Sequence, residues 1–493
     1  MPSSIILLAL SALAVATYGI ANIIYNLFFH PLRRFPGPKL WAATPLPAAL
    51  NVLGGLSHIK VLELHKQYGD IVRIGPNELA FAHQDAWKEI CGHLKRGQEE
   101  NEKDPKYADE SRDLSLIPAS RERHGRLRKL LSHAFSARAM AEQQPLIDKY
   151  INLFIQRLKE HGEGGKKALD ATKWFEWTTF DIIGDLAFGE PFGCLQLSTS
   201  HPWVESFFQS MKMIPVVQAL HDLPFYCLLK PIYFLLLIPK IVLETRRGSQ
   251  QFAEEALRKR LLLKGDRPDF VDAMVRKTDT ILSPLELRDN SILLTTAGSE
   301  TTASTLTAVT YLLATHPDIL SQLNAEVRSA FRDESEIDVN SVQNLSYMLA
   351  VLKEAMRVHP PVAISLPRRS PPSGVQISGE HINGGTTLGI WQYALYHNPS
   401  KFLDPDSFIP ERWLDDERFA NDAKHLHQPF SYGPRNCLGM NLAYAEMRLI
   451  LARIIWNFDI EVAPESTHWT KNQKVFFFWD KPPLWTYFKP RQV

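Results

Sequence analysis

Cysteine is scarce in this sequence, with only four among 493 residues. They lie far apart, form no CxxC pair, and are Cys91, Cys194, Cys227 and Cys437. This spacing gives no sign of a zinc site, and four cysteines in so long a chain do not make a disulfide scaffold. Free cysteines usually behave as small buried hydrophobes, which is the expectation for the first three. The sparse use of cysteine fits a reducing, cytosol-facing compartment.

An excess of charge of one sign is also lacking. Lysine and arginine number 55 against 54 aspartates and glutamates, so the net charge is +1. This balance argues against a nucleic-acid-binding protein, which usually shows a clear basic excess. Neither GxGxxG nor GxxxxGK[ST] occurs, so the chain offers no dinucleotide or phosphate site of its own. A redox enzyme with this sequence would therefore take its electrons from another protein.

Residues 5–29, IILLALSALAVATYGIANIIYNLFF, contain no charged residue. A helix needs about 20 apolar residues to cross a bilayer, and Arg33 and Arg34 follow directly. The pattern predicts a membrane anchor over residues 1–30 with its C-terminal side in the cytosol. A cleaved secretory signal, with AVA at residues 14–16 as its cleavage site, is the alternative. It lacks a basic start, and the apolar run continues well beyond that site.

The rest of the chain, residues 31–493, is predicted to form one large and mostly helical domain with small sheets. Pro31, Pro36 and Pro38 indicate a stiff elbow between the anchor and this domain. The longest helical pattern covers residues 282–315 and would span roughly 50 Å. Its centre, TTAGSETTAST, is small and polar where a core helix should carry bulk. Residues 70–83 have the alternation of a β-hairpin.

The fourth cysteine, Cys437, lies in the glycine-rich stretch FSYGPRNCLG. Gly433 and Gly439 would let the backbone approach the sulfur, and a strong amphipathic helix follows, whose dipole favours a thiolate. Phe430 could shield a metal ligand from water, and Arg435 could meet a carboxylate of a cofactor. A buried, unreactive thiol is the alternative for a single cysteine in such a bend.

The residues around Cys437 favour a ligand over an unreactive thiol, because all five fixed positions of the pattern FxxGxRxCxG are met. These are Phe430, Gly433, Arg435, Cys437 and Gly439. Here the chain resembles the cytochrome P450 superfamily of haem-thiolate monooxygenases. It is most similar to the microsomal fungal branch, and within it to the isotrichodermin C-15 hydroxylase-like group of secondary metabolism. The resemblance implies the cytochrome P450 fold, haem b as cofactor, and Cys437 as the proximal ligand of the haem iron.

A second stretch, AGSETT at residues 297–302, matches the family's [AG]Gx[DE]T[TS] element. Ala297 and Gly298 are small enough to let the helix lie close to a flat macrocycle. Glu300 and Thr301 are the expected catalytic residues, an acid and a hydroxyl that relay protons to O₂. The alternative is a polar patch whose hydroxyls bond to carbonyls four residues earlier.

Two further motifs are predicted to hold the fold and the cofactor. The family's ExxR pair is Glu354 and Arg357, joined by Arg412 of the PERW segment, and it acts as a structural brace.

The family's WxxxR motif, which holds a haem propionate, has His124 in place of the tryptophan and Arg128 four residues on. Arg368 is the second expected propionate ligand, with Arg369 as the alternative.

The resemblance further implies a full reaction. One oxygen atom enters a lipophilic substrate, of terpenoid, polyketide or cyclic-peptide type, and electrons come from NADPH through a separate reductase. Location in the endoplasmic reticulum membrane is expected, with the catalytic domain in the cytosol. The expected pocket-lining segments are residues 113–119, 207–217, 362–366 and 475–479, with Ser299; residues 230–240 would dip into the membrane surface or pack in the core. The alternatives are a haem-thiolate isomerase or dehydratase, an oxidative coupling enzyme, and a non-catalytic haem sensor.

Overall fold

The computed structural model describes residues 2–94, 97–107, 114–221, 240–263, 267–275 and 282–491. The predictions for Cys227, for Asp113 and for residues 230–239 lie outside these ranges. Helices dominate the described part of the chain, as predicted, and the strands are short.

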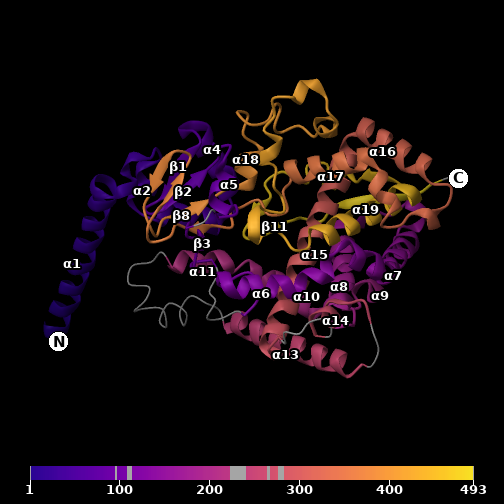
Figure 1. Cartoon of the computed structure of the whole chain (residues 1–493), viewed down its shortest axis with the longest axis horizontal. Helices are drawn as coiled ribbons and strands as arrows, with labels where there is room; N and C mark the ends of the chain where they lie inside the picture. Colours follow the sequence, from indigo (N-terminus) through magenta and orange to yellow (C-terminus); the bar gives the residue numbers. More distant parts are fainter. Residues whose placement is uncertain are drawn as a thin grey trace.

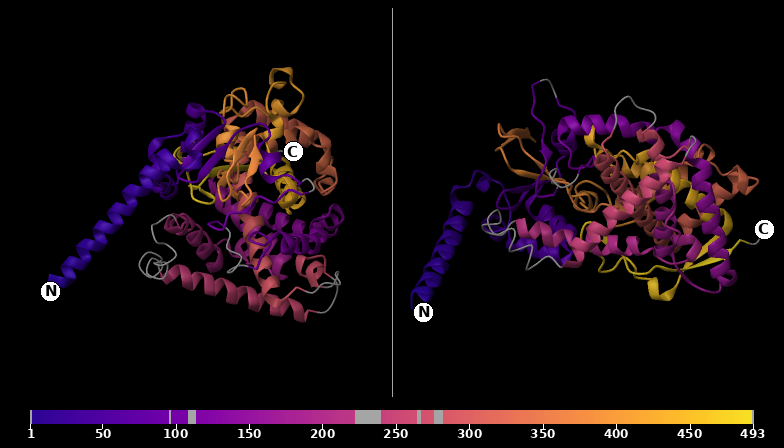
Figure 2. Two further views of the ribbon diagram at one scale, coloured as in Figure 1. Left: turned by 60° about the vertical axis from the view of Figure 1, so that its left-hand side comes forward. Right: turned by 90° about the horizontal axis from the view of Figure 1, so that it is seen from below.

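The α-helices pack into one body from which only the first projects (Figures 1 and 2). They are α1 (Pro2–Ile24), α2 (Lys39–Ala43), α3 (Leu46–Gly54), α4 (Ser57–Tyr68), α5 (Ala86–Cys91), α6 (Arg121–Ser132), α7 (Ala137–His161), α8 (Ala171–Phe188), α9 (Cys194–Leu197), α10 (Pro202–Met211), α11 (Ile214–His221), α13 (Lys240–Leu262), α14 (Phe270–Val275), α15 (Pro284–Thr315), α16 (Pro317–Ala330), α17 (Ser346–Val358), α18 (Gln392–Tyr396) and α19 (Met440–Asn457).

The strands form four small sheets, in the orders β1-β2-β8-β5-β3, β4-β12-β9, β6-β7 and β10-β11. They are β1 (Ile71–Gly75), β2 (Glu78–Phe81), β3 (Glu102–Lys103), β4 (Leu169–Asp170), β5 (Arg368–Arg369), β6 (Val375–Ile377), β7 (Glu380–Ile382), β8 (Thr387–Gly389), β9 (Phe458–Val462), β10 (Lys474–Val475), β11 (Trp479–Asp480) and β12 (Trp485–Pro490). The predicted hairpin is confirmed as the antiparallel pair β1 and β2. In the largest sheet β3 pairs with β5, which places Lys103 opposite Arg368.

The longest helix, α15, begins with a complete capping box. The Ser283 side chain accepts a hydrogen bond from the backbone N–H of Glu286, and the Glu286 carboxylate accepts one from the N–H of Ser283. Pro284 occupies the first helical position, where its fixed φ suits the helix. The helix continues for 32 residues and crosses the middle of the domain, which confirms the prediction for residues 282–315 (Figure 1).

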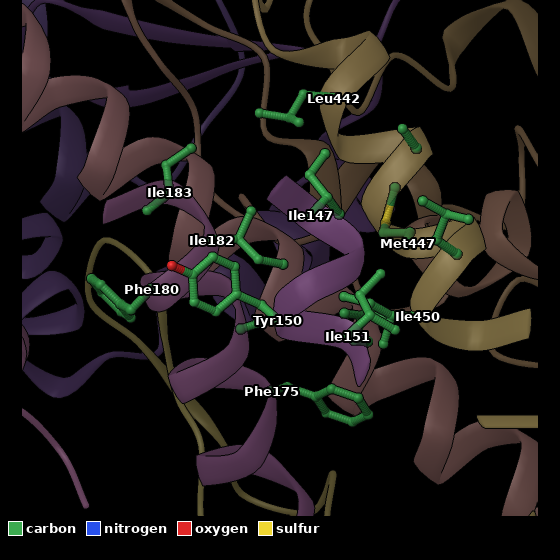
Figure 3. Packing of buried hydrophobic residues seen from close by; sticks show 14 of the residues in the cluster. Ile147, Tyr150, Ile151, Phe175, Phe180, Ile182, Ile183, Leu442, Met447 and Ile450 are labelled. Atoms are coloured by element: carbon green, nitrogen blue, oxygen red, sulfur yellow. The ribbon is translucent and has the colours of Figure 1, made fainter. Parts of the chain in front are cut away.

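The main hydrophobic core lies between α7, α8, α15 and α19. Figure 3 shows Ile147, Tyr150 and Ile151 of α7 facing apolar side chains of the neighbouring helices. Each fully buried aliphatic or aromatic side chain contributes roughly 1.5–3 kcal/mol relative to an exposed one. The helix α8 is buried around nearly its whole circumference rather than on one face, because other helices cover it on several sides. This packing fixes α15 in the centre.

The first helix, α1, stands away from the domain (Figures 1 and 2). Within the described residues, no helix combines the length and the apolar character that crossing a membrane requires. The end of the apolar run is nevertheless attached to the domain, since the Asn26 side chain donates to Ala43 O and Arg73 donates to Asn26 O, both at 3.0 Å. Leu32 of the proline-rich elbow is buried in the domain. The elbow is therefore part of the folded body.

Candidate active site

The cysteine loop, residues 430–439, lies directly before α19 and contains one 3-10 turn, Gly433–Arg435. The backbone N–H of Cys437 donates to Phe430 O at 2.7 Å, which closes the loop. Gly433 has a φ of +76°, and a Cβ there would lie 2.0 Å from Cys91 O, so only glycine fits. A Cβ at Gly439 would meet only the Cys437 Sγ and the Phe135 ring, each at 3.9 Å. The protein therefore leaves open space beside the sulfur.

The Cys437 side chain is solvent-accessible, although protein atoms surround it closely. Desolvation by the surrounding protein raises the pKa of this thiol, while a hydrogen bond from the Gly439 backbone and the charge of Arg128 act in the opposite direction. The hydrogen bond from Gly439 acts in the direction expected at a helix N-terminus, and desolvation acts against it. Binding of a metal ion would deprotonate the thiol outright.

Four basic side chains predicted from separate motifs come together around one cavity of about 550 Å³. They are His124 and Arg128 of α6, Arg368 of β5, and Arg435 of the turn before the cysteine. Burial, followed by the charges of Arg435 and Arg128, lowers the pKa of His124 to about 4. The neutral ring at pH 7 can still donate one hydrogen bond.

The structure distinguishes between the two arginines of β5. Arg368 is buried and its Nε has no hydrogen-bond partner, whereas Arg369 is exposed on the other face and donates to Gly385 O. An unpartnered buried donor is costly, typically about 1–3 kcal/mol or more when charged. A bound anion would remove this cost, which favours Arg368 as the ligand of a carboxylate.

Other basic side chains of the cluster already have partners. Arg435 donates to Glu100 Oε1 at 2.7 Å and to Ala119 O at 2.8 Å. Arg128 donates to the carbonyl of Asn436 at 2.7 Å and to its side-chain oxygen. Both guanidinium groups are thereby held in place beside the cavity.

Sequence reasoning did not single out Lys103, which belongs to the same cluster. Burial lowers its pKa to about 7, and the neighbouring charges of Arg368 and Arg435 add to the effect. No motif marks this lysine, and the pairing of β3 with β5 places it opposite Arg368. With Lys103 the cluster has a clear surplus of positive charge, opposed locally by Glu100. This surplus suits a ligand with carboxylates.

One face of α15 is open in the middle of an otherwise buried helix. Ala297 is exposed and Thr301, one turn later, is partly exposed, whereas Ser299 and Glu300 are fully buried. The Thr301 hydroxyl donates to Ala297 O at 2.7 Å. This is the bond to a carbonyl four residues earlier that a merely structural polar patch would show. Gly298 has a different role from the expected one, because a Cβ there would lie 2.8 Å from Ile183 Cδ1. It lets α15 pack closely on α8.

Glu300 lies in a separate polar environment from Thr301. Its Oε1 forms an ion pair with Lys481, and its buried Oε2 has no partner. Burial raises the pKa of Glu300 to about 7, and the charge of Lys481 opposes that rise. No hydrogen bond joins the Glu300 and Thr301 side chains in the described structure. The two expected catalytic residues are thus neighbours in sequence whose polar groups have different partners.

The brace of Glu354, Arg357 and Arg412 is confirmed. All three side chains are fully buried, Arg357 Nη2 lies 2.8 Å from Glu354 Oε1, and Arg412 Nε lies 3.3 Å from the same oxygen. Trp413 donates to the other carboxylate oxygen at 2.9 Å, and Arg412 also pairs with Asp422. The network ties α17 to the PERW segment and assigns these residues a structural role.

The residues present fit the haem that the sequence resemblance implies. An accessible thiol beside Arg128, a nearby surplus of cations and an unpartnered buried arginine suit an iron macrocycle with two carboxylates. The accessible face of α15 around Ala297 and Thr301 carries small side chains, which suit a flat ligand. Phe430 is partly buried, and its ring lies 5.1 Å from that of Tyr444, so it packs against α19 beside the cysteine.

Comparison with known proteins identifies the family. Residues 36–486 match the family model "Cytochrome P450". The chain is 45% identical over 489 residues, 98% of each chain, to trichothecene C-15 hydroxylase of Fusarium sporotrichioides. It is 43% identical over 491 residues to the cytochrome P450 monooxygenase astA of Talaromyces wortmannii, covering 99% of this chain and 98% of the relative. Identity to averantin hydroxylase of Dothistroma septosporum is 42% over 487 residues, 97% of this chain and 91% of the relative. The chain therefore belongs to the cytochrome P450 family and is a cytochrome P450 monooxygenase.

Proposed function

We propose that this monooxygenase inserts one oxygen atom from O₂ into a lipophilic intermediate of fungal secondary metabolism, by hydroxylation or epoxidation. The names of relatives that match over nearly the whole chain, a trichothecene hydroxylase and an averantin hydroxylase, support this class. The terpenoid, polyketide and cyclic-peptide classes remain the candidates. The observation that carries the proposal is the cationic cluster of His124, Arg128, Arg368 and Arg435 around one cavity, with Arg128 bonded to Asn436 next to the accessible thiol of Cys437.

In this proposal each site residue has a role toward haem b. Cys437 is the iron ligand, and the cationic cluster holds the two propionates. Gly433 shapes the loop, Gly439 leaves room beside the sulfur, and Phe430 covers the loop on the side of α19. Haem supplies the activation of O₂ when it is bound. Glu300 and Thr301 are proposed to deliver protons at the open face of α15.

Electrons are proposed to come from NADPH through a separate reductase. Basic side chains on the surface near the cysteine could dock an acidic partner. Arg435 is only 5% exposed in its side chain and is engaged with Glu100, so it does not belong to such a surface. Arg121 and Lys129 of α6 are exposed where the helix borders the cavity, and they remain candidates.

Attachment to the endoplasmic reticulum membrane through residues 1–30, with the catalytic domain 31–493 in the cytosol, is also part of the proposal. It is supported by exposed apolar side chains on and after α1, among them Leu10, Leu13, Phe28 and Phe29. Leu46 and Leu50 of α3, a helix beyond the elbow, are exposed as well. Apolar side chains gathered in this way mark a surface that contacts lipid or another protein. Removal of residues 2–29 should release the protein from microsomes while haem binding survives.

The experiment that tests the reaction class uses isotopically labelled oxygen. Full-length protein in microsomes is combined with a fungal reductase, NADPH and ¹⁸O₂, and offered a panel of terpenoids, polyketides and cyclic dipeptides. The proposal predicts one labelled oxygen atom in the product and NADPH-dependent formation. Product formed without reductase would favour an isomerase or dehydratase, and a product that gains no oxygen would favour oxidative coupling.

A further inference from the structure

A row of alternating charges connects Glu300 with the outside of the protein. Lys481, which lies between β11 and β12, pairs with Glu300, and its Nζ is also 3.8 Å from Glu176 Oε1. The second oxygen of Glu176 lies 2.9 Å from the Nζ of Lys173, one turn earlier on α8. The exposed fraction of the side chain rises along the row: 0% for Glu300, 2% for Lys481, 6% for Glu176 and 45% for Lys173. The row therefore begins in the core and ends in solvent.

Burying the charged side chains of this row costs folding free energy, so their presence favours a functional role. Desolvation of an ion costs several kcal/mol, and apolar replacements for a buried ion pair are often at least as stable. Glu300 also keeps Oε2 buried without a hydrogen-bond partner. One oxygen thus holds the lysine, while the other has no hydrogen-bond partner.

Both protonation states of Glu300 are accessible near neutrality. Burial raises its pKa to about 7; Lys481 and Lys173 lower it, and Glu176 raises it. Two other charged or titratable groups interact with the row. Asp170, at the start of α8, lies near Glu176 and Lys173, and His359 faces Lys481 but stays neutral, since burial lowers its pKa to about 4.

We propose that Lys173, Glu176 and Lys481 form a route along which protons reach Glu300 from solvent, with Lys481 as the positioning residue that holds its carboxylate. The inference rests on the proposed function, in which Glu300 supplies protons beside Thr301. When Glu300 releases a proton, the Lys481 ammonium replaces it along their shared hydrogen bond. The Lys481 amine regains its proton through Glu176 from Lys173, and Lys173 from water. One proton enters for each that leaves, and no electron moves.

A purely structural ion pair is the competing explanation, and the two can be separated by the protonation state of Glu300. Infrared difference spectra between acidic and alkaline pH show the protonated carboxyl, assigned by its loss in Glu300→Gln. Because Lys481 lowers the pKa of Glu300, Lys481→Met should move this titration to higher pH, and Lys481→Arg should keep it near the wild-type position. The matched control is Lys401→Met, which removes the Lys401–Asp70 ion pair, also 2.8 Å long, elsewhere in the fold. An unmoved titration in Lys481→Met would contradict the proposed pairing.

Proton delivery itself is tested by product formed per NADPH. Lys481→Met and Glu176→Gln should each lower this ratio by roughly tenfold or more, within the usual range of general acid–base assistance, and release hydrogen peroxide instead. Lys401→Met should keep the wild-type ratio. Glu176→Gln changes one atom, so it remains informative if Lys481→Met does not fold. Wild-type ratios in both variants would overturn the route.

Hydrogen peroxide in place of O₂, reductase and NADPH separates this inference from the proposed function. Peroxide already carries the two electrons and two protons that O₂ lacks, so the variants should form product from it at near wild-type rates. Equal losses with both oxidants would overturn the route, because they would indicate general damage to the site. A wild-type protein that forms no product with either oxidant would overturn the proposed function and, with it, the route.

Discussion

Arg128 of α6 donates two hydrogen bonds to Asn436, the residue immediately before Cys437. Nη1 lies 2.7 Å from the Asn436 carbonyl oxygen, and Nη2 bonds to the side-chain oxygen. This contact ties the helix that carries His124 to the loop that carries the thiol, across more than 300 residues of sequence. The contact therefore holds the cationic cluster and the cysteine loop in a fixed relative position.

Arg128→Met should weaken haem binding without abolishing it. Hydrogen bonds to a charged group contribute about 1.5–3 kcal/mol, which corresponds to roughly 10–100-fold faster haem loss. The measurement is the rate of haem transfer to an excess of a haem-scavenging protein. Arg138→Met, at an exposed arginine of α7, is the control and should leave the rate unchanged. Equal rates in wild type and Arg128→Met would show that the contact does not position the site.

Gly433→Ala should destabilise the protein, whereas Gly439→Ala should leave its unfolding nearly unaffected. Alanine at position 433 combines a φ of +76° with a Cβ 2.0 Å from a backbone oxygen, while a Cβ at 439 meets nothing closer than 3.9 Å. Left-handed backbone alone costs roughly 1–2 kcal/mol for a residue other than glycine, and the clash adds to it. The check is the midpoint of chemical unfolding of both variants. Similar midpoints would contradict the steric account.

Motifs at fixed spacing predicted much of this molecule. The cysteine loop, the Glu354–Arg357 pair and the long helix around Thr301 are local patterns, since their residues lie within one turn, one loop or one helix. Such patterns are visible in a sequence because local backbone geometry dictates them. The positions of His124, Arg128 and Arg368 around one cavity followed from the family resemblance.

Contacts between distant segments could not be predicted in the same way. Lys103 reaches the cationic cluster only because β3 pairs with β5, and a two-residue strand leaves no periodic signal. Lys481 meets Glu300 across 181 residues, and nothing around it distinguishes it from a surface lysine. Gly298 fits a small-residue motif, but only the position of Ile183 shows that it serves helix packing.

Acid should destabilise the protein partly through His359, which stacks on Trp479 with ring centroids 4.1 Å apart. Burial lowers its pKa from 6.5 to about 4, so its contribution is complete above pH 6.5 and is lost as the pH falls toward 4. Between pH 7 and pH 5 the loss is about 2 kcal/mol. His359→Phe, which keeps an aromatic ring there, should reduce this pH dependence.

The measurement for His359 is the midpoint of urea unfolding at the two pH values. His359→Phe also loses the hydrogen bond to Gln473, so the difference between the pH values is informative and the absolute midpoint is not. His468→Phe, at an exposed position, is the control and should keep the wild-type pH dependence. An unchanged difference in His359→Phe would mean that other groups cause the acid sensitivity.

Thr301→Ala should keep haem, fold and substrate binding but divert NADPH into hydrogen peroxide. The hydroxyl lies on the open face of α15, and its loss removes a proton donor worth up to 10²–10⁴-fold, although water can replace part of it. Product per NADPH should fall clearly, while NADPH consumption falls less. Thr305→Ala, whose hydroxyl only caps Thr301 O at 2.9 Å, is a matched control on the same helix. Unchanged coupling in Thr301→Ala would refute the assigned role.

The reduced carbon monoxide spectrum of Cys437→Ser tests the assignment of the iron ligand most directly. A thiolate ligand gives this complex its red-shifted Soret band, so the serine variant should lack the band. Cys91→Ser and Cys194→Ser should retain it, because neither side chain belongs to the cysteine loop. A wild-type spectrum from Cys437→Ser would contradict the account of the site.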